Sequence, residues 1–162
     1  MKGKLAVLGI AAVAYFYAGG QHAVTAASGT GVHVTSGSET AFIRATLADL
    51  GAPATQADIG SLASWFPHEF PSWPPSATDN PMASTMPEPG ATVFNSDKVR
   101  NYVSATQGAQ ATAATLADGD YPGIVAALRS GSGLCGDSSL AGEFLTWSGD
   151  GYSGVCTSGA TA

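Results

Sequence analysis

The chain has 162 residues, a length that fits one domain with a buried core of its own. Only 11% of the residues are charged, and acidic residues outnumber basic ones by 12 to 6, which gives a formal net charge of −6. This composition argues against nucleic acid as a partner, because binding to phosphates needs clustered lysine and arginine. Low charge with abundant small residues is typical of an exported protein.

Residues 1–26 have the pattern of an export signal. Lys2 and Lys4 give a basic start, and residues 5–18 form a 14-residue apolar stretch, which is shorter than the about 20 residues that span a bilayer. Small residues around Ala26 predict cleavage after that position. We therefore expect a secreted or envelope-associated protein. The alternative is a retained N-terminal membrane anchor, and we expect no other contact with a membrane.

Residues 27–37 are small and polar without periodicity, and they predict a flexible linker. The domain itself is predicted to cover residues 38–157, and residues 158–162 are predicted to be a disordered tail. Ser38 is a suitable N-cap for a helix that Gly51 ends. Its apolar residues recur at helical spacing, which predicts a core-facing stripe made of Phe42, Ile43, Leu47 and Leu50.

A second amphipathic helix is predicted directly after the first. Thr55 and Asp58 form a capping box at its start. We expect this helix to end or kink at Phe66, because Pro67 lacks an N–H group and its ring collides with the preceding turn. Glu69 is then predicted to lie just beyond the break.

From Pro71 to about Val99 the chain is rich in proline, which predicts loops with room for a short β-hairpin at "TVFN" (residues 92–95). Long loops on a helical frame commonly carry function. Helical periodicity returns in three segments, residues 101–119, 120–131 and 138–149. In the first of them we expect the core-facing side to consist of Val103, Ala109, Ala113 and Leu116. The predicted fold is mostly α, with about five helices and a loop-rich insert between the second and third.

Cys135 and Cys156 are the only cysteines. An even number in an exported chain favours one disulfide, worth about 3 kcal/mol in the chain-entropy model. We expect no metal site and no cofactor, because the three histidines, His22, His33 and His68, do not cluster with the cysteines in the sequence.

The stretch "WFPHEFPSWPP" (residues 65–75) places Glu69 among aromatic residues and prolines. An apolar setting raises the pKa of a carboxyl group by disfavouring its anion, as a general acid near neutral pH requires. A solvent-facing glutamate on a proline-rich loop is the competing interpretation. The residues around Glu69 leave these two interpretations open.

The order of motifs resembles the lysozyme-like domains of actinobacteria and their phages, which occur in peptidoglycan-cleaving lytic transglycosylases and endolysins. The resemblance covers about residues 39–153. The residues that carry it are Trp65, Glu69, "NPMAST" (80–85), "PGATVFNS" (89–96), "VRNY" (99–102), "QGAQATAATL" (107–116), "YPGIVAALRSG" (121–131) and "FLTWSGDGY" (144–152).

The resemblance implies a lysozyme-like fold, a monomer, and a peptidoglycan glycan strand as the substrate, with Glu69 as the general acid and base. A second carboxylate would be needed for hydrolysis with retention or inversion. Asp79, Glu88 and Asp97 are the candidates, and the sequence context of each favours a structural role. In lytic transglycosylases one glutamate is enough, because the 6-hydroxyl of the sugar attacks and gives an anhydro product.

The loop-rich insert is also expected to bind the glycan. Its amide and hydroxyl groups suit the N-acetyl and hydroxyl groups of the sugars, and the candidates are Asn80, Ser84, Thr85, Asn95 and Tyr102. Core packing is the expected role of Tyr121, and packing near the disulfide is expected for Trp147 and Tyr152.

Three residues depart from the family pattern. Pro67 interrupts the approach to the acid, Phe70 follows it instead of a small residue, and Ala83 takes a polar position in the Asn-Pro loop. These departures leave two other functions open. One is an inactive lysozyme-like module that binds wall polymer or belongs to an envelope or virion assembly, and the other is a small secreted interaction domain.

Overall fold

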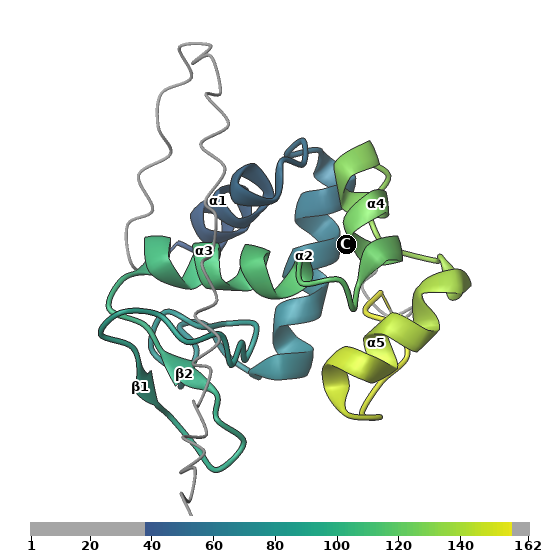
Figure 1. Cartoon of the computed structure of the whole chain (residues 1–162). Helices are drawn as coiled ribbons and strands as arrows, with labels where there is room; N and C mark the ends of the chain where they lie inside the picture. Colours follow the sequence, from purple (N-terminus) through teal and green to yellow (C-terminus); the bar gives the residue numbers. More distant parts are fainter. Residues whose placement is uncertain (1–37, 157–162) are drawn as a thin grey trace, which may run out of the picture. The chain divides into compact units, whose positions relative to one another are not determined.

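The computed structural model describes residues 38–156 (Figure 1). This part of the chain contains five α-helices and one two-stranded sheet, which are connected by loops. The helices are α1 (Glu39–Leu50), α2 (Gln56–Glu69), α3 (Ala105–Leu116), α4 (Pro122–Ser130) and α5 (Ala141–Ser148), and a 3-10 turn (Ser138–Leu140) precedes α5. β1 (Thr92–Val93) pairs antiparallel with β2 (Arg100–Asn101). The predicted mostly α architecture is therefore confirmed, with the hairpin in the insert between α2 and α3.

The predicted signal or anchor (1–26), linker (27–37) and tail (158–162) lie outside the described residues, as do His22 and His33. None of the helices within residues 38–156 is long and apolar enough to cross a membrane.

The predicted caps form as expected. The Ser38 side chain accepts a hydrogen bond from the Ala41 N–H, and the Thr55 side chain accepts one from the Asp58 N–H. Gly51 ends α1 with φ 70°, a backbone conformation that glycine adopts without steric cost. These helix ends are thus defined by residues within one turn and do not depend on tertiary contacts.

The predicted end of the helix at Phe66 is wrong, because α2 continues through Pro67 to Glu69. Pro67 lies in the last turn, where its missing N–H removes one helical hydrogen bond, and the Phe70 N–H still bonds to the Phe66 carbonyl at 2.8 Å. Trp65 and Phe66, which precede the proline, are buried in the core and stabilise this turn. Glu69 is therefore the last residue of a helix, not part of a loop.

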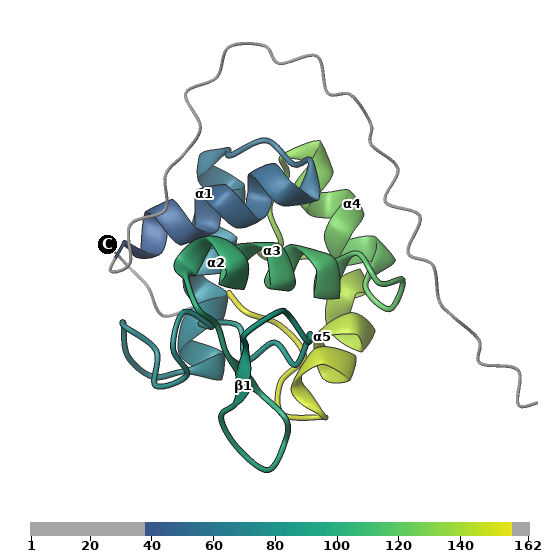
Figure 2. The same cartoon turned by 60° about the vertical axis from the view of Figure 1, so that its left-hand side comes forward.

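α1 and α3 pack against each other more extensively than any other pair of elements, and Figures 1 and 2 show them side by side. Gly108 of α3 permits a close approach to the insert, since a Cβ there would lie 1.8 Å from the Asp79 carbonyl oxygen. The predicted apolar face of α3 is correct except for Val103, which precedes the helix and is 65% exposed. Ser104 caps the helix, so the first helical residue is Ala105, two positions after Val103.

The start of α2 is bonded to the loop that follows α4. The fully buried Asp58 accepts a hydrogen bond from the Gly133 N–H at 3.1 Å, and the Ser61 hydroxyl accepts one from the Leu134 N–H at 2.7 Å. The Thr55 hydroxyl donates to the Gly131 carbonyl at 3.0 Å. These bonds fix the loop against the helix.

Glu143 of α5 connects that helix to the start of α4. Its two carboxylate oxygens accept hydrogen bonds from the Gly123 N–H (2.7 Å) and the Ile124 N–H (2.8 Å). A helix N-terminus has unpaired N–H groups and the positive end of the helix dipole, so a carboxylate there is stabilising. Tyr121, the N-cap residue, makes no side-chain capping bond, so Glu143 takes over that role.

We expect Glu143→Gln to lower the free energy of unfolding by about 1–2 kcal/mol, because the amide loses the charge and presents an NH2 group to one backbone donor. Urea unfolding monitored by circular dichroism measures the loss. The matched control is Glu88→Gln in the insert, a half-buried glutamate that caps none of the described helices, for which a change below about 0.5 kcal/mol is expected. Equal effects of the two substitutions would contradict the capping role of Glu143.

Candidate active site

A cavity of about 680 Å³ lies at the C-terminal end of α2. Figure 1 shows this end of the helix between the insert on one side and α5 on the other. The cavity is lined by the end of α2, the insert, α3, the N-cap residue of α4, α5 and the C-terminal segment (residues 149–156). The lining residues are His68, Glu69, Ala83, Ser84, Thr85, Asp97, Val99, Thr115, Tyr121, Trp147, Ser148, Gly149, Gly151 and Tyr152. The cavity therefore combines one largely buried carboxyl group with aromatic rings and hydroxyl groups.

Burial raises the pKa of Glu69 above its ordinary value of 4.5. Hydrogen bonds from Tyr152, Trp65 and Trp147 and the charge of His68 lower the pKa, but burial outweighs them. As the last residue of α2, the carboxyl group also lies at the negative end of the helix dipole, which disfavours its anion further. Glu69 therefore retains its proton at a pH where an exposed glutamate has lost it.

Tyr152 connects Glu69 to the core. The Trp65 indole N–H donates to the Tyr152 hydroxyl, which in turn donates to Glu69 Oε1. Burial and the neighbouring Glu69 raise the pKa of Tyr152, so its hydroxyl stays protonated and remains a donor. The His68 ring lies 4.7 Å from the Tyr152 ring. These contacts limit the positions that the Glu69 carboxyl can take.

A tight turn after α5 positions Tyr152. The Ser148 hydroxyl accepts hydrogen bonds from the Gly151 N–H (3.0 Å) and the Tyr152 N–H (3.1 Å). Gly149 and Asp150 both have positive φ, at 58° and 68°, which reverses the chain toward α2.

The predicted disulfide between Cys135 and Cys156 is confirmed, with the two Cα atoms 5.0 Å apart. It joins the end of the C-terminal segment to the loop after α4. Since Cys156 follows Tyr152 by four residues, the disulfide restricts the segment that carries the Glu69 partner.

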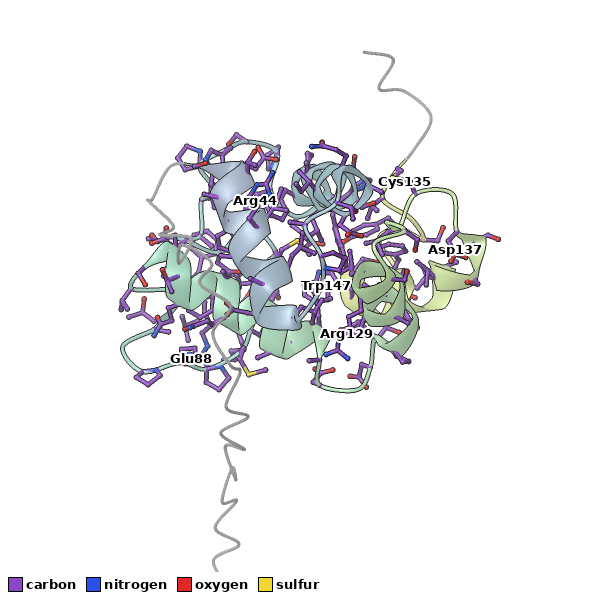
Figure 3. All side chains as sticks on the ribbon, turned by 90° about the horizontal axis from the view of Figure 1, so that it is seen from above. Arg44, Glu88, Arg129, Cys135, Asp137 and Trp147 are labelled. Atoms are coloured by element: carbon purple, nitrogen blue, oxygen red, sulfur yellow. A yellow bond between two sulfur atoms is a disulfide. The ribbon has the colours of Figure 1, made fainter. Side chains whose placement is uncertain are left out.

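The aromatic wall of the cavity is continuous with the core. The Trp65 ring packs edge-on against Phe144 (5.0 Å) and Trp147 (5.1 Å), and Tyr121 lies 5.1 Å from Trp147. Figure 3 shows Trp147 within the body of the molecule. Core packing was expected for Tyr121 and packing near the disulfide for Trp147; the two rings pack against each other, and both also line the cavity. A rigid ring face next to an acid suits the apolar face of a sugar.

The structure divides the predicted glycan-binding residues into two groups. Ser84 and Thr85 line the cavity. Asn80 is fully buried, and its amide bonds to the Ser84 carbonyl and N–H and to the Arg100 carbonyl at 2.7–2.9 Å.

The remaining two predicted residues also make internal bonds. The buried Tyr102 donates its hydroxyl proton to the Met86 carbonyl at 2.9 Å. The Asn95 side chain accepts hydrogen bonds from the Asp97 and Val99 N–H groups. Together with Asn80, these side chains shape the insert and do not line the cavity.

Among the three candidates for a second carboxylate, Asp97 alone lines the cavity. Asp79 has φ 53° at a turn and is in contact with α3 through its carbonyl. Glu88 is half-buried and does not line the cavity, and Figure 3 shows it at the edge of the molecule opposite Asp137. Any chemistry at this cavity that requires two carboxylates must therefore use Glu69 and Asp97.

Within residues 38–156 no group of three or more histidine, cysteine or acidic side chains is arranged to hold a metal ion. Comparison with known proteins gives no match to a family model, a curated protein or a solved structure. The resemblance to lysozyme-like domains therefore stays a prediction from the motifs. The residues that line the cavity are the structural basis for assigning a function.

The partner role of Tyr152 was not predicted from the sequence. Tyr152 lies 83 residues after Glu69, and no periodicity or motif connects the two positions. The only signal was indirect, since the short segment "SGDGYSGVC" is dense in glycine and ends at a cysteine. Such a segment turns tightly and is fixed in place once the disulfide forms.

We expect Tyr152→Phe to raise the pKa of Glu69 further, because the variant loses a hydrogen bond that favours the carboxylate. A ¹³C NMR titration of the glutamate side-chain carboxyl carbons measures the shift. Tyr121→Phe is the matched control, because Tyr121 lines the same cavity without a hydrogen bond to Glu69. A Glu69 pKa that is unchanged or lower in Tyr152→Phe would contradict the assigned contact.

Glu69→Gln is expected to stabilise the fold at neutral pH. At a pH well below the ordinary glutamate pKa of 4.5, the carboxyl is protonated in the folded and the unfolded chain. As the pH rises, the unfolded chain loses this proton first, so the stability of the wild type falls until the pH passes the raised folded pKa. The glutamine variant lacks this decline.

Urea unfolding of both proteins between pH 4 and 8 measures the difference. The advantage of Glu69→Gln should grow with pH, and Glu88→Gln corrects for the loss of one negative charge. A stability difference between the two proteins that stays constant or decreases as the pH rises would show that burial does not raise the pKa of Glu69.

Proposed function

We propose that the protein is an exported enzyme that cleaves the glycan strand of peptidoglycan, as a lytic transglycosylase or a muramidase, with Glu69 as general acid and base. The observation that carries the proposal is the position of Glu69, a carboxyl group with a raised pKa at the wall of a 680 Å³ cavity. The motif order shared with lysozyme-like domains supports the choice of substrate, and the predicted N-terminal signal supports export.

The surroundings of Glu69 suit both halves of such a reaction. Burial raises the pKa of the carboxyl and so favours its protonated form, which can donate its proton to the glycosidic oxygen as the bond from C1 to that oxygen breaks. The donors around it, Tyr152 and the indoles of Trp65 and Trp147, then stabilise the carboxylate that remains. That carboxylate can accept a proton from the hydroxyl group or water that attacks C1.

The number of carboxylates at the cavity determines the product. With Glu69 alone, the 6-hydroxyl of the sugar attacks C1, gives its proton to Glu69 and forms an anhydro ring. With Asp97 as a second participant, water attacks and a reducing end results. We favour the first reaction, because Asp97 is exposed whereas Glu69 is partly buried and bonded.

A second candidate function is a wall-binding or assembly module without activity. The hydrogen bond that Tyr152 donates to Glu69 Oε1 favours it, because one of the two carboxyl oxygens already has a protein partner and only the other is left for a substrate. Such a module would retain affinity for the wall polymer when Glu69 is replaced.

Mass spectrometry of fragments released from purified actinobacterial peptidoglycan tests the proposal. We expect anhydro-muropeptides from the wild type and a loss of about 10²–10⁴-fold in release rate for Glu69→Gln, the usual contribution of a general acid. Asp97→Asn is the matched control and should retain activity. Reducing ends that depend on Asp97 would replace the transglycosylase with a hydrolase, and binding without release in both proteins would favour the module.

A further inference from the structure

A second cavity, of about 460 Å³, adjoins the Glu69 cavity. His68 and Tyr152 line both cavities. The rest of its wall comes from the loop after α4, from α5 and from the C-terminal segment that the disulfide joins to that loop. The side chains of His68 and Tyr152 are therefore a wall common to the two cavities.

The second cavity has an apolar base and a polar rim. Leu134, Phe144 and Val155 are buried apolar residues of its wall. Asp137 and Ser153 are exposed at its edge. This combination suits a group with an aliphatic stem and a polar end.

Asp137 is the carboxylate of this rim. Its Oδ1 atom accepts hydrogen bonds from the Ser139 N–H (2.9 Å) and hydroxyl (2.5 Å), and these bonds lower the pKa of Asp137. Within residues 38–156, Oδ2 accepts no hydrogen bond. Figure 3 shows Asp137 at the outer edge of the molecule, on the same side as Cys135. The carboxylate is thus ionised, and one oxygen is available to a ligand.

The charge around this rim favours a cation. The part of the chain from residue 38 to residue 156 contains four basic and twelve acidic side chains, a formal net charge of −8. None of the four basic residues lines the second cavity, and His68 is its one other titratable group besides Asp137 and Tyr152. An ammonium group at Asp137 therefore meets no fixed positive charge.

We propose that the second cavity binds the peptide branch of the peptidoglycan strand, with the aliphatic stem of a diamino acid on the apolar base and its ammonium group beside Asp137. This assignment rests on the proposed function, because it takes the glycan strand as the ligand of the first cavity.

The chemistry of the substrate supports this occupant. Peptidoglycan carries short peptides on every second sugar, so a sugar bound beside Glu69 has a peptide within a few bonds of the cleaved linkage. A diamino acid in that peptide combines an apolar stem with an ammonium group. The cavity that adjoins the Glu69 site presents the complementary pair of surfaces, and its volume is within the usual range for a small-ligand site.

The experiment uses the full chain carrying Glu69→Gln, so that the substrate stays intact, and isothermal titration calorimetry with three soluble probes. The probes are a muropeptide with a free side-chain amine, the same muropeptide with that amine acetylated, and a glycan fragment without peptide. We expect the first to bind most tightly. Adding Asp137→Asn should weaken its binding about two- to fivefold, as for an exposed ion pair, and should leave the acetylated probe unaffected.

Asp120→Asn is the matched control, because Asp120 is an exposed acid that lines neither cavity. In addition, NMR shifts caused by a synthetic tripeptide with a C-terminal lysine should be concentrated in residues 134–138 and 153–156. Equal affinity for the free and acetylated amines, an equal effect of Asp120→Asn, or shifts elsewhere would each overturn the assignment.

The same data separate this assignment from the proposed function. If the wild type releases no fragments but the amine-dependent binding appears, the enzyme activity is wrong and the peptide site stands. If fragments are released in a Glu69-dependent manner but binding ignores the amine, the peptide site is wrong and the activity stands.

Discussion

The position of α2 depends on hydrogen bonds at both of its ends, and the candidate site follows from that position. At its start, Asp58 and Ser61 bind the backbone of the loop after α4. At its end, Tyr152 and Trp65 bind each other and Glu69. The partners outside α2, namely Gly133, Leu134 and Tyr152, all come from the C-terminal part of the chain. The helix is thereby fixed between the insert and α5, and its last residue faces the cavity between them.

The same arrangement has an energetic cost at Glu69. A carboxyl group at a helix C-terminus, partly removed from water, is an unfavourable choice for stability alone. Three hydrogen-bond donors reduce this cost without removing it. Ionisable groups with shifted pKa values are concentrated at functional sites, so the raised pKa of Glu69 favours a catalytic role for this residue.

Sequence reasoning succeeded where the signal was local. Ser38, Thr55 and Gly51 marked helix ends because capping depends on residues within one turn. It failed at Pro67, where tertiary packing of the preceding aromatic residues outweighed a local preference. The candidate site was predicted in part: Glu69, Ser84 and Thr85 line the cavity, whereas Asn80 and Tyr102 make internal bonds. The direction in which a polar loop side chain points depends on partners that are distant in the sequence, as for Asn80 and Tyr102. No periodicity or motif in a single sequence predicts those partners.

The distance along the chain between Glu69 and Tyr152 has a consequence for biosynthesis. The two residues are 83 positions apart, and the contact between them needs α3, α4 and α5 to have been made first. During translation α2 emerges long before Tyr152 does, so the acid has neither its partner nor its enclosing wall while the chain is growing. The pKa of Glu69 therefore reaches its value in the folded protein only after the chain has been synthesised at least as far as Tyr152.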